Sequence, residues 1–254
     1  MRIVIDTDSR RLSVDDANGK AEMDLYSPEA FAALSRQWIR VGWAQRYSYQ
    51  FTWMGRPIIQ LPEDMVRTQE TIWRTRPDVI VETGVAHGGS LVFYASLCEL
   101  LGKGQVIGVD IEIRSHNRAA IEAHPMASRI ALIEGSSIDP ATVNQVKARI
   151  PTGSRVMVLL DSNHTKAHVR AELEAYAPLV STDCYIVATD GIMHDLHDVP
   201  GGVADWTWNH ATAAAAEFAA EHPEFVLERL TPPFSETKIE EPVTYWPGAW
   251  LRRR

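Results

Sequence analysis

The stretch Val79-Ile80-Val81-Glu82-Thr83-Gly84-Val85-Ala86-His87-Gly88-Gly89-Ser90 decides the fold of this chain. An apolar run ends in an acid, passes through a glycine-rich turn and reaches a serine that begins a helical pattern. Glycine lets the backbone approach a ligand closely, and a helix N-terminus offers unpaired N–H groups. The stretch therefore predicts a buried strand, a ligand-binding turn and a helix, in that order.

Four more short apolar runs follow at intervals filled by helical patterns: Val106–Val109, Ile130–Ile133, Val156–Leu160 and Tyr185–Ala188. Continuous apolar strands that alternate with helices indicate a mostly parallel sheet with helices on both faces. We therefore expect an α/β fold. After an alanine-rich helix over Asn209–Glu221, the segments Phe225–Arg229 and Val243–Tyr245 are expected to form a closing strand pair.

The first 60 residues precede this pattern and are interpreted as an N-terminal extension, with residues 61–254 as the main domain. Residues 1–26 alternate weakly around Asn18-Gly19, a hairpin signal. Ser27-Pro28-Glu29 then begins a helix, because serine caps and proline suits the first helical position. The apolar residues of that helix keep to one stripe: Phe31, Leu34, Trp38, Ile39 and Val41.

Aromatic residues crowd the segment Trp43–Trp53. We favour a packing layer against the main domain, because aromatic side chains mostly serve burial. The alternative is a wall of the substrate pocket, in which Tyr49 and Trp53 would suit a sugar or another polyol.

Composition bounds the class of protein. The chain has 254 residues, 45% of them hydrophobic, which suffices for one sizeable core. A net charge of −8 disfavours a nucleic-acid partner, and Arg252-Arg253-Arg254 is too short to reverse that balance. Neither a signal peptide nor a membrane span is evident, so we expect a soluble, cytoplasmic protein. Cys98 and Cys184 are interpreted as buried, reduced thiols.

Acids at the strand ends indicate which ligand the turn suits. The second strand ends with Asp110, 21 residues beyond Gly89, where a carboxylate can accept hydrogen bonds from ribose hydroxyls. A dinucleotide dehydrogenase shares that feature, but Ala86 stands where the second glycine of its motif belongs. Glu82 would repel a pyrophosphate and suits the positively charged end of S-adenosylmethionine instead. A tight turn without a ligand is the alternative.

Hydroxyl side chains border the same edge of the expected sheet. Ser136 and Ser137 follow the third apolar run, where they can lie beside an adenine. Since open α/β sheets bind ligands at the carboxyl ends of their strands, we expect these residues near the glycine-rich turn.

Two aspartates predict a metal site. Asp161 and Asp190 end the fourth and fifth runs, and Mg²⁺ commonly takes one or two carboxylates. A bound Mg²⁺ would lower the pKa of an alcohol, and His164 is the expected base for its proton. The alternatives are that both aspartates cap helices and that His164 is an exposed loop residue. His164 and His168 lack the adjacent Glu of a zinc protease.

Two further histidines are candidates for the substrate site. His87 lies inside the glycine-rich turn, and His194 lies on a loop after Asp190. A solvated loop is the alternative for His194.

With these residues assembled, the chain resembles the sugar O-methyltransferases of the rhamnosyl O-methyltransferase and cephalosporin hydroxylase family. The matching stretches cover roughly residues 45–254: Tyr49–Asp64, Glu82–Ser90, Gly108–Arg114, Glu134–Ser137, Leu160–Thr165, His222–Phe225 and Pro247–Arg252. It is most similar to members that methylate deoxysugars in bacterial natural-product pathways, including TDP-rhamnose 3-O-methyltransferases. "Hydroxylase" is not carried over, because no iron-binding facial triad is recognisable.

The resemblance implies a Rossmann-like class I methyltransferase fold with bound S-adenosylmethionine. The residues expected to hold this cofactor are Glu82, Gly84, Gly88, Ser90, Asp110, Glu112, Ser136, Ser137 and Asp161. It also implies a divalent metal, Mg²⁺, at Asp161 and Asp190. Thr189 departs from the family pattern, which often carries an acid at this place, so the third metal ligand is unassigned.

The expected activity is metal-assisted O-methylation of a deoxysugar hydroxyl, on a sugar nucleotide or a glycosylated natural product in antibiotic biosynthesis. One alternative is a catechol-type O-methyltransferase with the same metal. Another is a non-catalytic methyltransferase-like subunit. We also expect a homo-oligomer, with subunit contacts in the tryptophan-rich segment.

Overall fold

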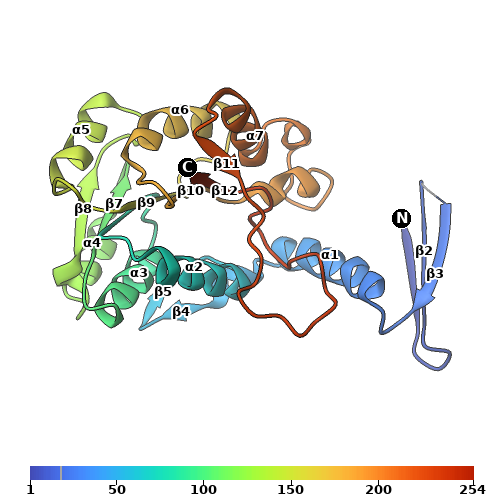
Figure 1. Cartoon of the computed structure of the whole chain (residues 1–254). Helices are drawn as coiled ribbons and strands as arrows, with labels where there is room; N and C mark the ends of the chain where they lie inside the picture. The colour runs from blue at the N-terminus through green and yellow to red at the C-terminus, as the bar shows by residue number, and fades with distance from the viewer. Residues whose placement is uncertain (18) are drawn as a thin grey trace.

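A seven-stranded sheet forms the centre of the molecule in a computed structural model, which describes residues 1–17 and 19–254 (Figure 1). Its strand order is β11-β12-β10-β9-β6-β7-β8. β12 runs antiparallel to β10 and β11, and the other pairs are parallel. The strands are β6 (Val79–Thr83), β7 (Gln105–Asp110), β8 (Ile130–Glu134), β9 (Val156–Leu160), β10 (Tyr185–Ala188), β11 (Phe225–Leu227) and β12 (Trp250–Arg253). The predicted α/β, Rossmann-like fold and all five predicted parallel strands are confirmed.

Helices cover both faces of this sheet. One hydrophobic cluster joins one face to α2 (Pro62–Thr75), α3 (Gly89–Leu100) and α4 (Ser115–Glu122). The other cluster joins the opposite face to α5 (Pro140–Arg149), α6 (Lys166–Tyr176) and α7 (Ala211–Glu221). Successive residues of β9 alternate between the two clusters, which explains why the strand is apolar throughout. Short 3₁₀ helices complete the domain: Tyr47–Gln50, Ala127–Arg129, Ala177–Leu179, Gly191–Leu196 and Ala204–Thr207.

The prediction for the closing strand pair is half wrong. Phe225–Leu227 is a strand, but its partner is Trp250–Arg253 rather than Val243–Tyr245. The backbone N–H of Tyr245 instead donates to the carboxylate of Asp64 on α2, at 2.8 Å. A contact with a residue 181 positions away therefore removes this apolar segment from the sheet.

The chain begins with a small separate sheet. β1 (Arg2–Asp6), β2 (Arg11–Asp16) and β3 (Gly19–Asp24) pair antiparallel in that order, which confirms the hairpin, although Asn18 lies outside the described residues. α1 (Pro28–Ala44) follows, and the Ser27 hydroxyl caps it by accepting from the backbone N–H of Ala30 at 3.1 Å. Figure 1 shows this sheet projecting from the body at the N-terminal end of α1.

The aromatic segment lies on the body rather than on the projecting sheet. Through the short pair β4 (Thr52–Trp53) and β5 (Arg56–Pro57), Trp53 reaches α3, where its ring lies 4.8 Å from that of Phe93. The division of the chain at residue 60 therefore stays a proposal. Both cysteines are buried and free, and no described helix is long and apolar enough to cross a membrane.

The buried carboxyl of Asp64 should make stability depend on pH. Burial raises the pKa of Asp64 to about 7, although Thr244 and Tyr245 donate hydrogen bonds to it. Because the ordinary value is 3.8, the folded chain holds this proton more tightly than the unfolded chain between these two pH values. The contribution of Asp64 to the free energy of unfolding should therefore fall as pH rises through that window.

Urea unfolding at several pH values, of the native chain and of Asp64→Asn, measures this dependence. The native chain should lose more stability with rising pH than the variant does. Parallel pH profiles would contradict the prediction.

Candidate active site

The glycine-rich turn and the end of β9 touch each other. Gly84 has a φ of +90°, and a Cβ at this position would lie 2.0 Å from the carbonyl oxygen of Asp161. A Cβ on Gly89 would lie 2.1 Å from the carbonyl oxygen of Pro57. Both glycines therefore permit backbone contacts that no other residue allows. The edge at which β6 and β9 end is one continuous site.

Gly84→Ala tests this contact. The added methyl group meets the Asp161 backbone, and alanine is strained at this φ, a cost of order 1–3 kcal/mol before the clash is counted. We expect a lower thermal midpoint together with weaker binding of S-adenosylhomocysteine. Gly153→Ala is the matched control, since its φ is +83° but nothing lies within 4 Å of its Cβ position. Equal effects of the two substitutions would contradict a specific role for the Gly84–Asp161 contact.

Glu82 lies below the turn and is closed off from solvent. Its carboxylate accepts hydrogen bonds from the Ser90 hydroxyl at 2.5 Å and the Tyr94 hydroxyl at 3.0 Å, and the residue is fully buried. Burial, reinforced by the nearby charge of Asp161, raises the pKa of Glu82 well above its ordinary value. Glu82 therefore orients Ser90 directly, and its expected contact with a sulfonium cofactor stays a prediction.

Asp110 faces the same turn from the end of β7. One carboxylate oxygen accepts from the backbone N–H of Val85 at 2.8 Å and of Ala86 at 3.3 Å. The other oxygen accepts from the backbone N–H of Glu112 at 3.2 Å, and Glu112 itself is exposed. Gly88 caps α3 without a side-chain hydrogen bond, so the first N–H groups of this helix stay available.

Asp161, His164 and Asp190 converge at the ends of β9 and β10. The His164 Nε2 atom lies 3.3 Å from a carboxylate oxygen of Asp190 and 3.9 Å from one of Asp161. One ligand atom from each of the three residues lies within 4.8 Å of the others. Asp190 has a left-handed backbone, with a φ of 56°, a strained conformation that is often found at functional sites. Two carboxylates at this spacing suit a divalent cation such as Mg²⁺, and the imidazole lies beside them.

The charge of this group perturbs its members. Burial and the neighbouring charge of Asp190 together raise the pKa of Asp161 to about 6. His164 and a hydrogen bond from Thr189 act in the opposite direction. A cation placed between the two aspartates would relieve their repulsion.

Sequence reasoning missed two residues that support Asp161. Thr189, noted only as a missing acid, is fully buried, and its hydroxyl lies 2.8 Å from both an Asp161 carboxylate oxygen and the Leu160 carbonyl. Gln60 is also buried and donates to the Tyr94 hydroxyl at 3.2 Å, while its own carbonyl oxygen has no protein partner. The only advance signal was an isolated polar residue beside apolar runs.

His168 joins the loops that follow β8 and β9. Its Nε2 atom lies 3.1 Å from the Ser137 hydroxyl and 3.2 Å from the Ser162 hydroxyl. Ser162 also donates to buried Glu172 at 2.7 Å. Because Ser162 and Glu172 both approach the same nitrogen of His168, the group is not a nucleophilic triad. Ser137 is thereby held beside the site, and Ser136 precedes it on the same loop.

The four candidate substrate residues do not form one wall. Tyr49 is exposed beneath the Arg46 guanidinium, and the Trp53 indole N–H donates to Ser96 at 3.0 Å. A role for either residue in the substrate pocket stays a prediction. His87 stays in the turn, half-buried. His194 follows Asp190, in the 3₁₀ helix Gly191–Leu196, and is exposed. Its ring centroid lies 5.0 Å from that of His210, which caps α7.

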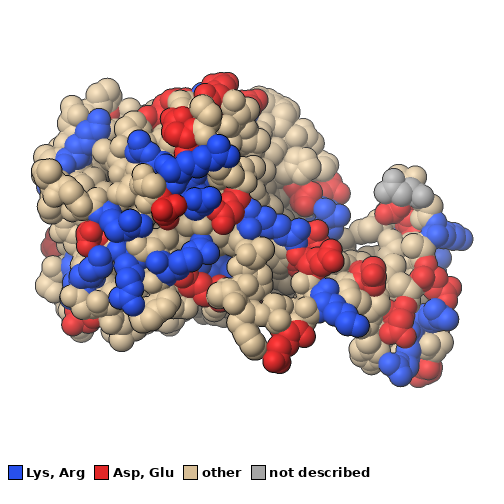
Figure 2. Space-filling model, viewed as in Figure 1, with Lys and Arg blue, Asp and Glu red and all other residues tan. Residues whose placement is uncertain are grey.

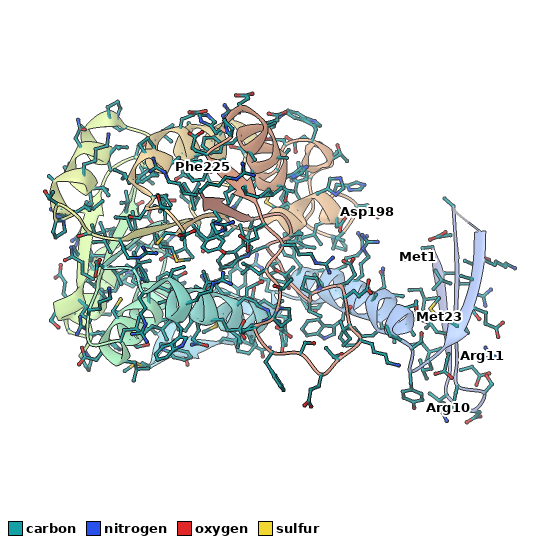
Figure 3. All side chains as sticks on the ribbon, viewed as in Figure 1. Met1, Arg10, Arg11, Met23, Asp198 and Phe225 are labelled. Carbon is teal, nitrogen blue, oxygen red and sulfur yellow. The ribbon has the colours of Figure 1, made fainter. Side chains whose placement is uncertain are left out.

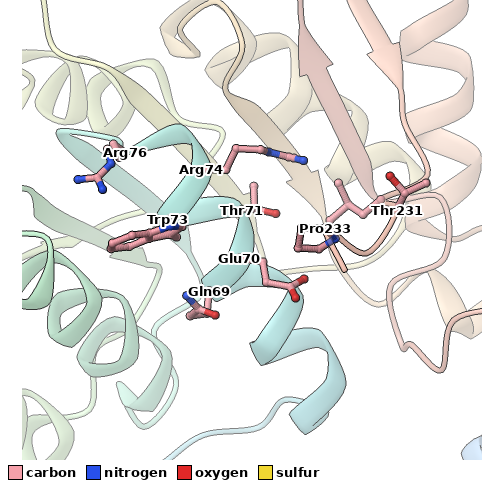
Figure 4. A pocket seen from close by; sticks show the side chains of 9 residues that line it. Gln69, Glu70, Thr71, Trp73, Arg74, Arg76, Thr231 and Pro233 are labelled. Atoms are coloured by element: carbon pink, nitrogen blue, oxygen red, sulfur yellow. The ribbon is translucent and has the colours of Figure 1, made fainter. Parts of the chain in front are cut away.

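A separate cavity of about 450 Å³ lies beside α2 (Figure 4). It lies at the end of α2 that leads into the start of β6, whereas the converging acids follow the strand ends. It is therefore not part of the site. Its lining residues are Gln69, Glu70, Thr71, Trp73, Arg74, Arg76, Leu230, Thr231 and Pro233.

Comparison with known proteins adds to this geometry. A family model described as Rhamnosyl O-methyltransferase/CmcI matches residues 45–254. Rhamnosyl O-methyltransferases of Mycobacterium bovis and Mycobacterium leprae are 31% and 30% identical over 155 and 141 residues, which are 59% and 55% of this chain. These matches span 60% and 59% of the relatives' own lengths.

A solved CmcI structure described with Mg and SAM shares the fold. It covers 81% of this chain and 77% of its own, with 19% identity and a TM-score of 0.54.

Proposed function

This chain belongs to the rhamnosyl O-methyltransferase/CmcI family, and on that premise we propose that it is an S-adenosylmethionine-dependent O-methyltransferase. The observation that carries the proposal is the contact between the glycine-rich turn at Gly84 and Asp161, beside His164 and Asp190. A cofactor site and an acid–base group thus share one edge of the sheet. Ligands of open α/β sheets bind at such an edge.

The proposed acceptor is a deoxysugar hydroxyl, on a sugar nucleotide such as TDP-rhamnose or on a glycosylated natural product of bacterial secondary metabolism. The mycobacterial relatives are described as rhamnosyl O-methyltransferases, which supports a sugar acceptor. From the sequence resemblance we propose more specifically that the methylated hydroxyl is the one at position 3 of rhamnose. Tyr49 and Trp53 stay the proposed contacts for such a sugar, although the Trp53 indole N–H already donates to Ser96.

S-adenosylmethionine would supply an electrophilic methyl group. The free N–H groups at the start of α3 suit its carboxylate end. Asp110 would accept from the ribose, and Ser137, held by His168, would border the adenine. Glu82 acts beneath this layer by fixing Ser90.

Asp161 and Asp190 would hold a divalent cation, most suitably Mg²⁺. Two hard oxygen ligands fit this ion, and the CmcI structure described with Mg and SAM supports the choice. When bound, the ion would lower the pKa of the acceptor hydroxyl and fix its position. Thr189 orients Asp161 for this role through its hydroxyl.

His164 would take the proton of the acceptor hydroxyl. Its Nε2 atom faces the two carboxylates, which place the imidazole beside the proposed cation. General-base assistance of this kind typically contributes 10²- to 10⁴-fold in rate, about the range of a single catalytic histidine. We further propose that the enzyme works as a homo-oligomer.

Two measurements test the proposed function. Calorimetry should show binding of S-adenosylhomocysteine and none of NAD; the reverse result would return the chain to the dehydrogenase class. Labelled S-adenosylmethionine should then transfer its methyl group to a member of a panel of TDP-deoxysugars and glycosides. Transfer only to a catechol would favour the catechol-type alternative. Cofactor binding without transfer to any acceptor would favour a non-catalytic subunit.

A further inference from the structure

The N-terminal arm, residues 1–41, carries more apolar surface than this chain covers. The strand register places six apolar side chains on one face of its sheet: Ile3, Ile5, Leu12, Val14, Ala21 and Met23. Leu12 is fully buried and three of the others are half-buried, whereas Ala21 is exposed and Ile5 is 52% exposed. Scattered exposed apolar residues are ordinary, but a contiguous apolar face marks an interaction surface.

The opposite face of the same sheet is charged and satisfies itself. Arg11 lies 3.4 Å from Glu22, and Lys20 lies 3.6 Å from Asp15. Figure 3 shows Arg11 on the side of the sheet away from the body and Met23 on the side toward α1. The charged face therefore suits water, and the apolar face is turned back over α1.

α1 continues this apolar surface. Phe31, Trp38 and Val41 recur at helical spacing on one side, with Trp38 43% and Val41 61% exposed. The other side of the helix binds the body. Arg36 pairs with the side chain of Asp195 at 3.6 Å, and Arg40 donates to the Asp195 carbonyl and pairs with Asp198. The helix is thus fixed along one side, while the other side stays largely exposed, although Trp38 packs edge-on against Tyr47.

The arm has only a small core of its own, around Leu12 and Ala30. Three short strands need an apolar face packed against something to be stable in water, and here the start of α1 covers only part of that face. In Figure 2 the arm stands apart from the body, with a hollow between them. Within the single chain, the apolar face of the arm is therefore only partly covered.

We propose that a second copy of this chain covers the arm, by exchange of the two arms about a two-fold axis. The apolar face of the arm's sheet turns back toward its own body. In the proposed dimer, the sheet face of each chain packs on the side of the partner chain's α1 that corresponds to Phe31, Trp38 and Val41. Such an interface uses the same patch twice, as in most homodimers. An apolar face that the single chain leaves open needs a partner that is present whenever the chain folds. A second copy of the same chain meets this requirement.

The charges of the arm argue against other occupants. Residues 1–26 carry six acidic and four basic side chains, so they attract neither nucleic acid nor an anionic membrane: Asp6, Asp8, Asp15, Asp16, Glu22 and Asp24 against Arg2, Arg10, Arg11 and Lys20. In the tryptophan-rich segment, the Trp53 side chain packs inward on α3 and is not free for a subunit contact. The apolar face of the arm is therefore the surface that we propose for the subunit contact.

Light scattering after size exclusion tests the proposal, at chain concentrations of about 1 to 50 µM. The native chain should be a dimer or a larger even assembly. Ile5→Asp and Val41→Asp should each yield folded monomers, with circular dichroism and binding of S-adenosylhomocysteine confirming the fold. The milder Ile5→Thr and Val41→Ser should raise the dissociation constant by about tenfold, as expected for loss of part of a buried apolar side chain.

Leu100→Asp is the matched control, because Leu100 is 81% exposed on the body at the end of α3. It should associate like the native chain. A native chain that is monomeric throughout the range would overturn the proposal. So would arm variants that associate normally, or a Leu100→Asp variant that dissociates as they do.

Discussion

Asp161→Asn is expected to lower the rate of methyl transfer by about 10³-fold or more, because a bound cation contributes several kcal/mol and each 1.36 kcal/mol is tenfold. The substitution removes one negative charge where Asp161 and Asp190 converge. It keeps the shape of the side chain and an acceptor for the Thr189 hydroxyl, which lies 2.8 Å away. The effect should therefore be chemical rather than structural.

Two readouts separate these causes. Calorimetric titration with Mg²⁺ should show weakened binding to the variant, while the thermal midpoint stays close to that of the native chain. Asp183→Asn is the control, because Asp183 lies at the opposite edge of the sheet, before β10, and is exposed. Excess EDTA should silence the native enzyme, and added Mg²⁺ should restore it. Full turnover in EDTA would remove the metal from the reaction.

His164→Ala should cut methyl transfer by about 10²-fold or more, the usual size of a general-base contribution. The reason is that no other described imidazole lies between Asp161 and Asp190. Because the aspartates remain, Mg²⁺ should still bind. Exogenous imidazole should restore part of the lost rate, which a purely structural role would not allow.

His222→Ala is the control, because it removes a histidine that lies away from the proposed site. His222 lies beyond the far end of α7, stacked on Phe218 with ring centroids 4.0 Å apart. Its loss should leave kcat within about threefold of the native value, well below a general-base effect. A loss under about threefold in His164→Ala as well would falsify the assignment of the base.

The strands and the acids at their ends were predictable from sequence because both signals are local. A strand buried on two faces is apolar at every position, as β9 is, and the residue that follows it must stand at the sheet edge. The sequence therefore predicts that Asp161 and Asp190 lie close together, and both are within reach of His164 in the structure. The glycine-rich turn was equally readable, since Gly84 occupies a backbone region that favours glycine.

The support around Asp161 was not predictable in the same way. Thr189 stands next to Asp190, but its hydrogen bond to Asp161 spans 28 residues, and Gln60 reaches Asp161 and Tyr94 from a segment outside the predicted strands. The closing strand pair failed for a related reason. The apolar pattern of Val243–Tyr245 is typical of a strand, but the backbone N–H of Tyr245 donates to the Asp64 carboxylate instead of to a neighbouring strand.

The sequence by itself determined the order of strands and helices, the turn and the acids at the sheet edge, because chemical periodicity and glycine conformation act over a few residues. Only the tertiary structure decided that Glu82 is sealed beneath Ser90, that Trp53 packs inward, and that the arm extends uncovered from the body. Those outcomes depend on which distant surfaces meet. Burial is a property of the whole fold, and a short stretch of sequence does not specify its own neighbours.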